Sequence, residues 1–244
     1  MKAVYDKIYR DIKRRIESGE FAWQEFLPSE NTLIAEYSCS HNTVRKALAI
    51  LAREGYIVPV HGKGVRVIYY PRSQDRVVID SLGPFKNACA EKGLKLVTKV
   101  ISFERVVVTP ELSEITDFDE GEELLVVERV RNIDGRNVYL TKNYLLASIV
   151  GDMTPEDAED SIYSYLERER GMKVAVTKRI FMSEPVADHA REYLDFEGFQ
   201  CAAMMVNRVY NTEGTYFEYS KSWCSPRDIA MSDIIIRNGN LSFM

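Results

Sequence analysis

The strongest constraint on the fold of this chain is a pair of short helical segments, joined by a tight turn, near its amino terminus. The first follows Ser29, a favourable N-cap residue, and we expect it to run to about Glu36. The second follows Ser40, another N-cap candidate whose role Thr43 could share, and ends at Gly55, a residue type favoured just past a helix. Two short helices connected in this way predict a helix-turn-helix.

A further helix precedes this pair, and a hairpin follows it. The apolar residues before the pair recur every three or four positions, as on one helix face: Tyr5, Ile8, Ile12 and Ile16. Residues 56–60 and 65–69 read as two strands around the glycine-rich, cationic turn His61-Gly62-Lys63-Gly64. Three helices followed by this hairpin predict a winged helix-turn-helix over residues 1–70.

Charge is unevenly distributed along the chain. The net charge of −5 argues, by itself, against a nucleic-acid partner. Residues 1–70, however, contain eleven Lys or Arg and eight Asp or Glu, a balance of +3, and the remainder carries −8. Between residues 41 and 66, five basic residues stand against the single acid Glu54. A basic patch on an acidic chain indicates contact with a polyanion, with a solvated helix face as the alternative.

We therefore predict that the amino-terminal segment binds double-stranded DNA. Residues at the amino end of a recognition helix reach base edges in the major groove, where Arg45 can donate two hydrogen bonds to guanine. Ser29 and Thr43 can bond to phosphates, while Lys63 and Arg66 can follow the backbone or enter the minor groove. A capping threonine and a solvated turn lysine are the simpler alternatives for single residues. The candidate DNA-binding residues are Ser29, Glu30, Ser40, His41, Asn42, Thr43, Arg45, Lys46, Gly62, Lys63, Gly64 and Arg66.

A second domain follows a polar, proline-containing linker at residues 71–76. Between residues 77 and 244 we expect helices at 85–92, 161–169 and 188–193, and strands at 96–108, 123–132, 138–145, 174–184, 204–210 and 216–223. Asp134-Gly135 and residues 211–214 mark hairpin turns. Strands joined by hairpins and interrupted by isolated helices predict an α+β domain with a mixed, mainly antiparallel sheet.

Two arginines in this second domain point to an anion. Arg129 and Arg131 alternate on a predicted strand, so both side chains face the same side of the sheet. Burying two like charges together is costly unless an anion lies between them, which favours a phosphate or carboxylate ligand. The alternative is two exposed arginines that pair with nearby acids.

The sequence contains little that indicates catalysis, metal binding or membrane insertion. His189 is the only histidine after residue 70, and no nucleophile motif or phosphate-binding glycine loop accompanies it, so we expect no enzyme activity and no cofactor. The four cysteines lack metal-ligand spacing and read as reduced thiols in a cytoplasmic protein. No apolar run approaches the roughly 18 residues of a membrane helix, and the charged amino terminus does not suit a signal peptide.

The amino-terminal string LPSENTLIAEY, with SHNTVRKALAILAREGYI and GKGVRV after it, resembles the DNA-binding domain of the GntR family of bacterial transcription regulators. The resemblance covers nearly all of residues 1–70 and implies operator binding. That family usually places arginine where this chain has His41, so the operator preference would differ or depend more on Arg45.

The segment ERVRNIDGRNVYLTKNYL, followed by DSIYSYLERERGMKV, resembles the UTRA effector domain of the HutC branch, which has a fold like that of chorismate lyase. This resemblance implies that Arg129, Arg131, Ser161 and Tyr163 hold the anionic part of an effector, with Ser161 at a helix amino terminus. Glu218 would accept hydrogen bonds from effector hydroxyls, and Tyr219 would point to the opposite sheet face. Thr141, Pro84 and residues 224–227 depart from the family pattern; Thr141 occupies an effector-binding position that is often acidic.

The combined resemblance implies a cytoplasmic, homodimeric repressor that binds a palindromic operator. Within the branch, SIYSYLERERGMKV and SEPVADHAREYLDFEGF are similar to regulators of trehalose operons, which implies trehalose 6-phosphate as the inducer. One alternative is an effector of another type, an amino-sugar phosphate or a non-sugar carboxylate. The other is a lyase-like enzymatic second domain.

Overall fold

The computed structural model describes residues 4–70, 78–79, 89–90 and 93–231, and these form two compact units. Of the described residues, 4–70 belong to the first unit and 78–79, 89–90 and 93–231 belong to the second. The predicted linker at 71–76 and the carboxyl-terminal residues 232–244 lie outside the described residues.

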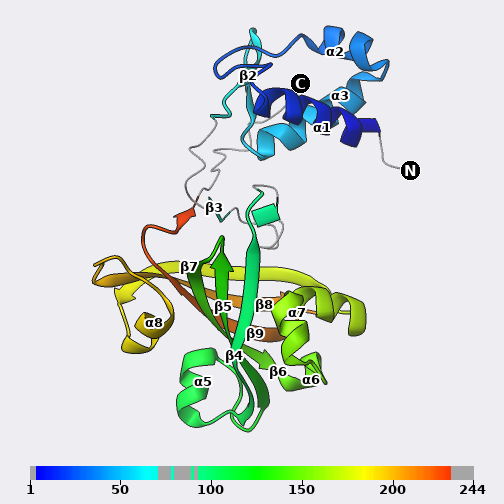
Figure 1. Cartoon of the computed structure of the whole chain (residues 1–244). Coiled ribbons are helices and arrows are strands. Elements are labelled where there is room, and N and C mark those ends of the chain that lie inside the picture. The colour runs from blue at the N-terminus through cyan, green and yellow to red at the C-terminus, as the bar shows by residue number, and fades with distance from the viewer. Residues whose placement is uncertain (1–3, 71–77, 80–88, 91–92, 232–244) are drawn as a thin grey trace. The chain divides into compact units, whose positions relative to one another are not determined.

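The first unit is the predicted winged helix-turn-helix (Figure 1). Its elements in chain order are α1 (Val4–Glu17), α2 (Glu30–Tyr37), α3 (His41–Arg53), β1 (Ile57–Val60) and β2 (Gly64–Val67), and the two strands pair antiparallel. Both predicted caps are confirmed: Ser29 accepts a hydrogen bond from the Thr32 amide at 3.1 Å, and Ser40 accepts one from the Thr43 amide at 3.3 Å. The caps start α2 and α3 where the sequence predicted.

One apolar core holds these elements together. Ile8, Ile12 and Ile16 of α1 are buried in the same cluster as Leu48 and Leu51 of α3. The segment before α2 joins the hairpin, because the Leu27 amide donates to the Val65 carbonyl at 2.8 Å. Burial of these apolar stripes leaves the polar amino end of α3 facing solvent.

The second unit is built on a six-stranded antiparallel sheet with the order β4-β5-β6-β9-β8-β7 (Figure 1). Its strands are β4 (Leu96–Val107), β5 (Glu123–Ile133), β6 (Arg136–Leu146), β7 (Val174–Pro185), β8 (Cys201–Asn211) and β9 (Tyr216–Cys224). A short parallel pair, β3 (Val78–Ile79) with β10 (Ala230–Met231), is separate from this sheet. The prediction of an α+β unit with mainly antiparallel strands is confirmed.

The described helices of this unit are α5 (Pro110–Thr116), α6 (Ala147–Val150), α7 (Pro155–Glu169) and α8 (Asp188–Tyr193). Only α8 has the predicted bounds. The predicted start of the 161–169 helix was wrong, because the helix begins at Pro155 and is interrupted at Ser161. Of the predicted helix at 85–92, the structure describes Cys89 and Ala90, both helical.

The start of α7 and all of α5 carry a sequence signal that the prediction did not use. Thr109 and Thr154 are N-caps, and each is followed by proline in the first helical turn. Proline is favoured there because its missing amide hydrogen would have no helical partner. Thr154 also forms a capping box with Asp157.

The two faces of the sheet pack against different helices. Leu125 and Val127 of β5 share a buried cluster with Ile162 and Leu166 of α7. The intervening Val126 packs on the other face, in the cluster that contains Phe118, just after α5. Farther along that other face lie residues of α8 and the segment after it, including Ala190, Leu194 and Phe196. Among the described residues, no helix is both long enough and apolar enough to cross a membrane.

Candidate DNA-binding and effector-binding sites

The amino end of α3 displays the polar residues that the sequence singled out. His41, Asn42 and Lys46 are exposed, whereas Val44 and Ala47 are fully buried in the core of the first unit. The helix therefore presents a polar face at the end where a recognition helix enters the major groove.

An ion pair orients Arg45 on this face. Its Nε donates to the Glu30 carboxylate of α2 at 3.0 Å, and the His41 Nδ1 lies 3.7 Å from the same carboxylate oxygen. A bidentate contact with guanine uses the fork-like donors of the guanidinium group, so a bond through Nε can hold the group while its terminal nitrogens point outward. Lys46 lies over the Tyr5 ring, with its Nζ 4.0 Å from the ring centroid.

The two cationic side chains of the hairpin, Lys63 and Arg66, differ in their exposure. Lys63 is exposed at the tip, between Gly62 and Gly64, which both have positive φ values, of 69° and 112°. Arg66 is half-buried, with its guanidinium carbon 4.5 Å from the Phe26 ring centroid and its Nη1 donating to Gln24 at 3.2 Å. These contacts brace the hairpin, and a DNA contact by Arg66 stays a prediction.

The hydroxyls of Ser29, Ser40 and Thr43 lie at the amino ends of α2 and α3. Ser29 lies 2.7 Å from the Thr32 hydroxyl, and Ser40 lies 2.9 Å from the Thr43 hydroxyl, in addition to the amide bonds of the caps. Ser40 alone is the cap of α3, and Thr43 supplies the amide that donates to it. A phosphate contact by Ser29, Ser40 or Thr43 stays a prediction.

In the second unit, Arg129 is a buried cation on the sheet face that α7 covers. Its side chain donates from Nη1 to the Ala158 carbonyl at 2.8 Å and from Nη2 to the Asn143 side chain at 2.9 Å, while its buried Nε forms no hydrogen bond. Burial, followed by the positive charge of Arg131, lowers the pKa of Arg129. The alternative of an exposed arginine is wrong for this residue, which is only 5% exposed.

Arg131 lies on the same face and is half-buried. Its Nη1 donates to the Thr141 hydroxyl at 2.7 Å, and that hydroxyl lies 3.0 Å from the hydroxyl of Ser222 on β9. Burial lowers the pKa of Arg131 as well. Thr141 thus gives Arg131 a neutral partner. A carboxylate at this position would neutralise one of the two arginines.

Glu218 and Tyr163 complete the polar cluster. Glu218 is 1% exposed; its Oε1 accepts a hydrogen bond from Asn143 at 2.7 Å, and its Oε2 is buried without a hydrogen bond of normal geometry. Burial, followed by the negative charge of Glu218, raises the pKa of Tyr163 well above its usual value, so the phenol stays protonated. Tyr219 packs in the opposite cluster with Val126, as predicted.

Ser161 interrupts α7 beside this cluster. Its φ and ψ of −172° and 115° are extended, and its hydroxyl accepts the Ser164 amide at 3.2 Å, so it caps the second half of the helix. Ala158, whose carbonyl holds Arg129, lies at the end of the first half. A helix amino terminus next to two arginines is a favourable place for an anion.

The sequence reasoning missed five polar residues on the same sheet face. Arg179 of β7 donates from Nε to Asn207 of β8 at 2.8 Å, and the Asn207 amide nitrogen lies 3.2 Å from the Ser220 hydroxyl of β9. The available signal was a polar residue at inward positions of otherwise apolar strands. The five are Asn143, Arg179, Asn207, Ser220 and Ser222.

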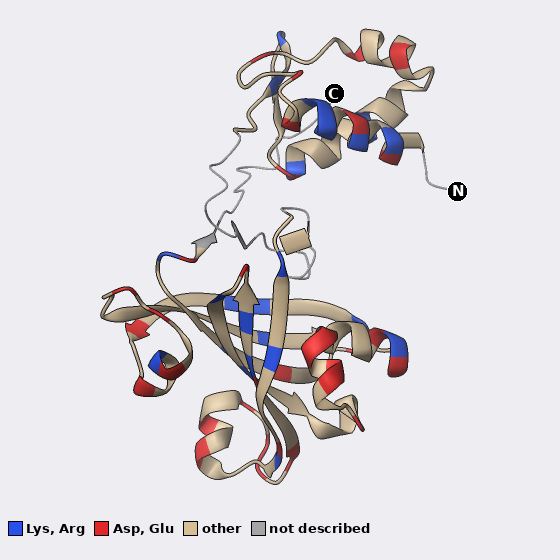
Figure 2. Ribbon diagram, in the orientation of Figure 1, with Lys and Arg blue, Asp and Glu red and all other residues tan. Residues whose placement is uncertain are grey.

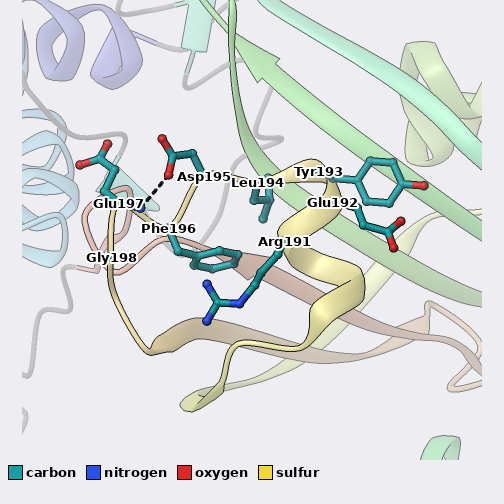
Figure 3. A pocket seen from close by; sticks show the side chains of 8 residues that line it. All are labelled: Arg191, Glu192, Tyr193, Leu194, Asp195, Phe196, Glu197 and Gly198. Carbon is teal, nitrogen blue, oxygen red and sulfur yellow. Dashed lines mark hydrogen bonds between the residues drawn. The ribbon is translucent and has the colours of Figure 1, made fainter.

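In Figure 2, which colours the ribbon by residue type, basic positions are visible on the strands of the second unit and acidic positions on α5, α7 and α8. The helices α7 and α8 also carry Arg168 and Arg191. A separate surface hollow of about 460 Å³ lies at α8 and its following loop, and it is lined by Arg191, Glu192, Tyr193, Leu194, Asp195, Phe196, Glu197 and Gly198 (Figure 3). None of the predicted effector residues lines this hollow.

Comparisons with known proteins match both units. Residues 4–67 match the model for bacterial regulatory proteins of the gntR family, and residues 91–229 match the UTRA domain. The HTH-type transcriptional regulator TreR of Bacillus subtilis is 34% identical over 215 residues, which cover 88% of this chain and 90% of TreR.

Two solved structures from Bacillus subtilis resemble the chain. The possible transcriptional regulator YydK has a TM-score of 0.81 at 24% identity and covers 96% of this chain and 100% of its own. The effector-binding domain of the trehalose repressor TreR has a TM-score of 0.53 at 28% identity and covers 58% of this chain and 98% of its own. With both family models matched in order and one relative above 30% identity along most of the chain, this protein belongs to the GntR family of bacterial transcription regulators, in the HutC branch that carries a UTRA domain.

Proposed function

We propose that this protein is a cytoplasmic, homodimeric repressor of a sugar-utilisation operon, released from its operator by a phosphorylated sugar. Trehalose 6-phosphate is the first candidate effector, because the similar TreR of Bacillus subtilis is described as a trehalose repressor. The observation that carries the effector half of the proposal is the buried Arg129, whose Nε has no hydrogen bond and which shares its sheet face with Arg131.

The polar cluster supports an anionic ligand with hydroxyl groups. A dianionic phosphate would compensate the buried Arg129 and the half-buried Arg131, and it would accept hydrogen bonds from both guanidinium groups, which suit phosphate geometry. The Ser161 helix start adds backbone donors on the same side. The buried Glu218 carboxylate, whose Oε2 forms no hydrogen bond of normal geometry, is an acceptor for a sugar hydroxyl.

The DNA half of the proposal depends on α3. Two copies related by a two-fold axis would place two recognition helices on the half-sites of a palindromic operator. The effector would release the repressor by binding more tightly to a conformation in which the two helices no longer match the half-site spacing.

A ligand screen tests the identity of the effector. We would measure the thermal unfolding of the full chain with trehalose 6-phosphate, glucosamine 6-phosphate or succinate, because a ligand of the native state raises the unfolding temperature. The proposal expects the largest increase with trehalose 6-phosphate. If only glucosamine 6-phosphate or only succinate raises the unfolding temperature, the effector is an amino-sugar phosphate or a non-sugar carboxylate, respectively. Each ligand would also be re-isolated after incubation, because a chemically altered ligand would indicate a lyase-like enzyme.

The variant Arg131→Ala tests the site. We expect unchanged operator affinity and no release by the effector that releases the wild type, because one of the two phosphate-binding cations is lost. Operator binding would be followed by fluorescence anisotropy with increasing effector. Arg168→Ala, which removes an arginine that is 62% exposed on α7, is the matched control and should respond like the wild type. Normal release of Arg131→Ala would contradict the proposed pocket.

A further inference from the structure

The polar face of the sheet extends well beyond the two arginines of β5. The strand register places Arg179 opposite Asn207, Asn207 opposite Ser220, and Ser220 opposite Asn143. These four residues therefore form one row across β7, β8, β9 and β6, on the face that also carries Arg129. We name them the polar row.

Side-chain hydrogen bonds link neighbouring residues at each end of the polar row. At one end, Arg179 donates to Asn207 at 2.8 Å, and Asn207 lies 3.2 Å from Ser220. At the other end, Arg129 donates to Asn143 at 2.9 Å, and Asn143 donates to Glu218 at 2.7 Å. The polar row spans three strand spacings, and Arg129 lies one strand farther, on β5. The backbones that carry Arg129 and Arg179 are therefore about 19 Å apart, much farther than the width of a phosphate group.

Tyr163 and Glu218 lie between the two ends. The positive charges of Arg129 and Arg179 both act on the Tyr163 hydroxyl, and the Glu218 carboxylate is beside it. Arg129 and Arg179 thus both lie near enough to Tyr163 to act on its hydroxyl. Beside it, the buried Glu218 carboxylate is an acceptor for a hydroxyl group.

Arg179 itself is arranged like a ligand-binding residue. It is half-buried, and burial lowers the pKa of its guanidinium group. Within the described part of the chain it forms no ion pair, and its Nε is held by the neutral side chain of Asn207. Because Asn207 occupies only the Nε of Arg179, the other guanidinium nitrogens can donate to a ligand. Neutral hydroxyl oxygens can accept these hydrogen bonds, so the ligand needs no second anionic group at Arg179.

We infer that Arg179, oriented by Asn207 and Ser220, binds the hydroxyl-bearing end of the effector and determines its size. The effector class is then an anion with two parts: a phosphate at Arg129 and Arg131, and a polyhydroxyl body that extends past Tyr163 and Glu218 to the far strand. A body of two linked sugar rings reaches Arg179, and a single ring does not. This inference rests on the proposed function and adds to it a residue that separates two-ring from one-ring phosphosugars.

Isothermal titration calorimetry on the full-length protein tests this role. The probes are inorganic phosphate, glucose 6-phosphate and trehalose 6-phosphate, which share an anion and differ in the attached body. For the wild type we expect the two-ring ligand to bind at least about tenfold more tightly than the one-ring ligand, the scale of discrimination by a few pocket contacts.

The variant Arg179→Ala should reduce this ratio to about one, while its affinity for inorganic phosphate stays within about twofold of the wild type, because only the distal contact is removed. Arg179→Lys keeps the charge but loses the planar fork, and we expect the same loss of discrimination from a variant with less risk to folding. Lys178→Ala, on the opposite side of the same strand, is the matched control and should keep the wild-type ratio.

Two results would overturn the assignment of Arg179. One is an unchanged ratio in both variants; the other is an equal loss of affinity for all three probes, which would indicate a structural role. If the wild type binds none of the three probes, the failure belongs to the proposed phosphosugar function itself, so the two failures are distinguishable.

Discussion

At the scale of single residues, Glu30 restrains Arg45, the side chain that we predict reads a base. An unrestrained arginine on a helix surface loses rotamer freedom when it binds a base. The Glu30 carboxylate restricts Arg45 in advance through a 3.0 Å bond to Nε. His41 lies beside the same carboxylate, so three of the candidate DNA-binding residues act as a group.

We predict that Arg45→Ala weakens operator binding by about 1–3 kcal/mol, the usual cost of losing a specific base contact. Glu30→Ala should weaken binding less, and adding it to Arg45→Ala should cost little more, because Glu30 acts through Arg45. Anisotropy titrations at one fixed salt concentration measure all three values. Additive losses would show that Glu30 contacts DNA independently, and an unchanged affinity of Arg45→Ala would exclude the base contact.

At the scale of elements, serine caps determine where α3 and the second half of α7 begin. Ser40 starts α3 immediately before His41, and Ser161 starts the second half of α7 immediately beside the arginine cluster. In both places a serine hydroxyl accepts an amide hydrogen of the first turn. Because a cap fixes which backbone amides and side chains lie at the helix end, it also fixes what that end can bind.

Loss of the Ser40 cap should destabilise the first unit. We predict that Ser40→Ala lowers its free energy of unfolding by about 1 kcal/mol, the typical contribution of such a cap, and weakens operator binding through fraying of the recognition helix. Urea unfolding and operator titration measure the two effects. Ser40→Asn, which keeps a good capping acceptor, is the control and should retain both properties. Equal stability of the alanine variant and the wild type would contradict the role of the cap.

At the scale of the whole molecule, the chain contains separate cores. Among the described residues, the buried cluster of the first unit is formed by residues up to Val67, whereas the sheet of the second unit packs against its own helices. The opposite charge balances, +3 for residues 1–70 and −8 for the rest, follow the same division. DNA and effector are therefore expected to bind to units that are stabilised separately.

The two tryptophans can report on this separation. Trp23 belongs to the first unit and is 54% exposed, and Trp223 of β9 donates from Nε1 to Glu184 at 2.6 Å. We predict that trehalose 6-phosphate raises the unfolding temperature seen by Trp223 in a Trp23→Phe variant and leaves the transition of Trp23 in Trp223→Phe nearly unchanged. Ligand at about 100 times its Kd adds about 2.7 kcal/mol to the unit that binds it. An equal increase in both variants would indicate a single cooperative unit.

The local sequence predicted the elements well where short-range chemistry decides them. Ser29 and Ser40 marked the starts of α2 and α3, and Gly55 marked the end of α3. Asp134-Gly135 marked a hairpin turn in which both residues have positive φ. The break at Ser161 was not predicted as a break. The helix propensity of the flanking residues is continuous there, and the extended conformation coincides with a tertiary contact, the bond from Arg129 to Ala158.

By itself, the sequence determined the winged helix-turn-helix, the mainly antiparallel second unit, and the pairing of Arg129 with Arg131 on one face. Caps, turns and period-two alternation depend on residues a few positions apart, and they can be read from the chain directly. Only the tertiary structure decided that Arg179 and Asn207 share the sheet face of those arginines. The strand order β4-β5-β6-β9-β8-β7 and its register bring these residues together. That order depends on long-range pairing, which no local pattern encodes.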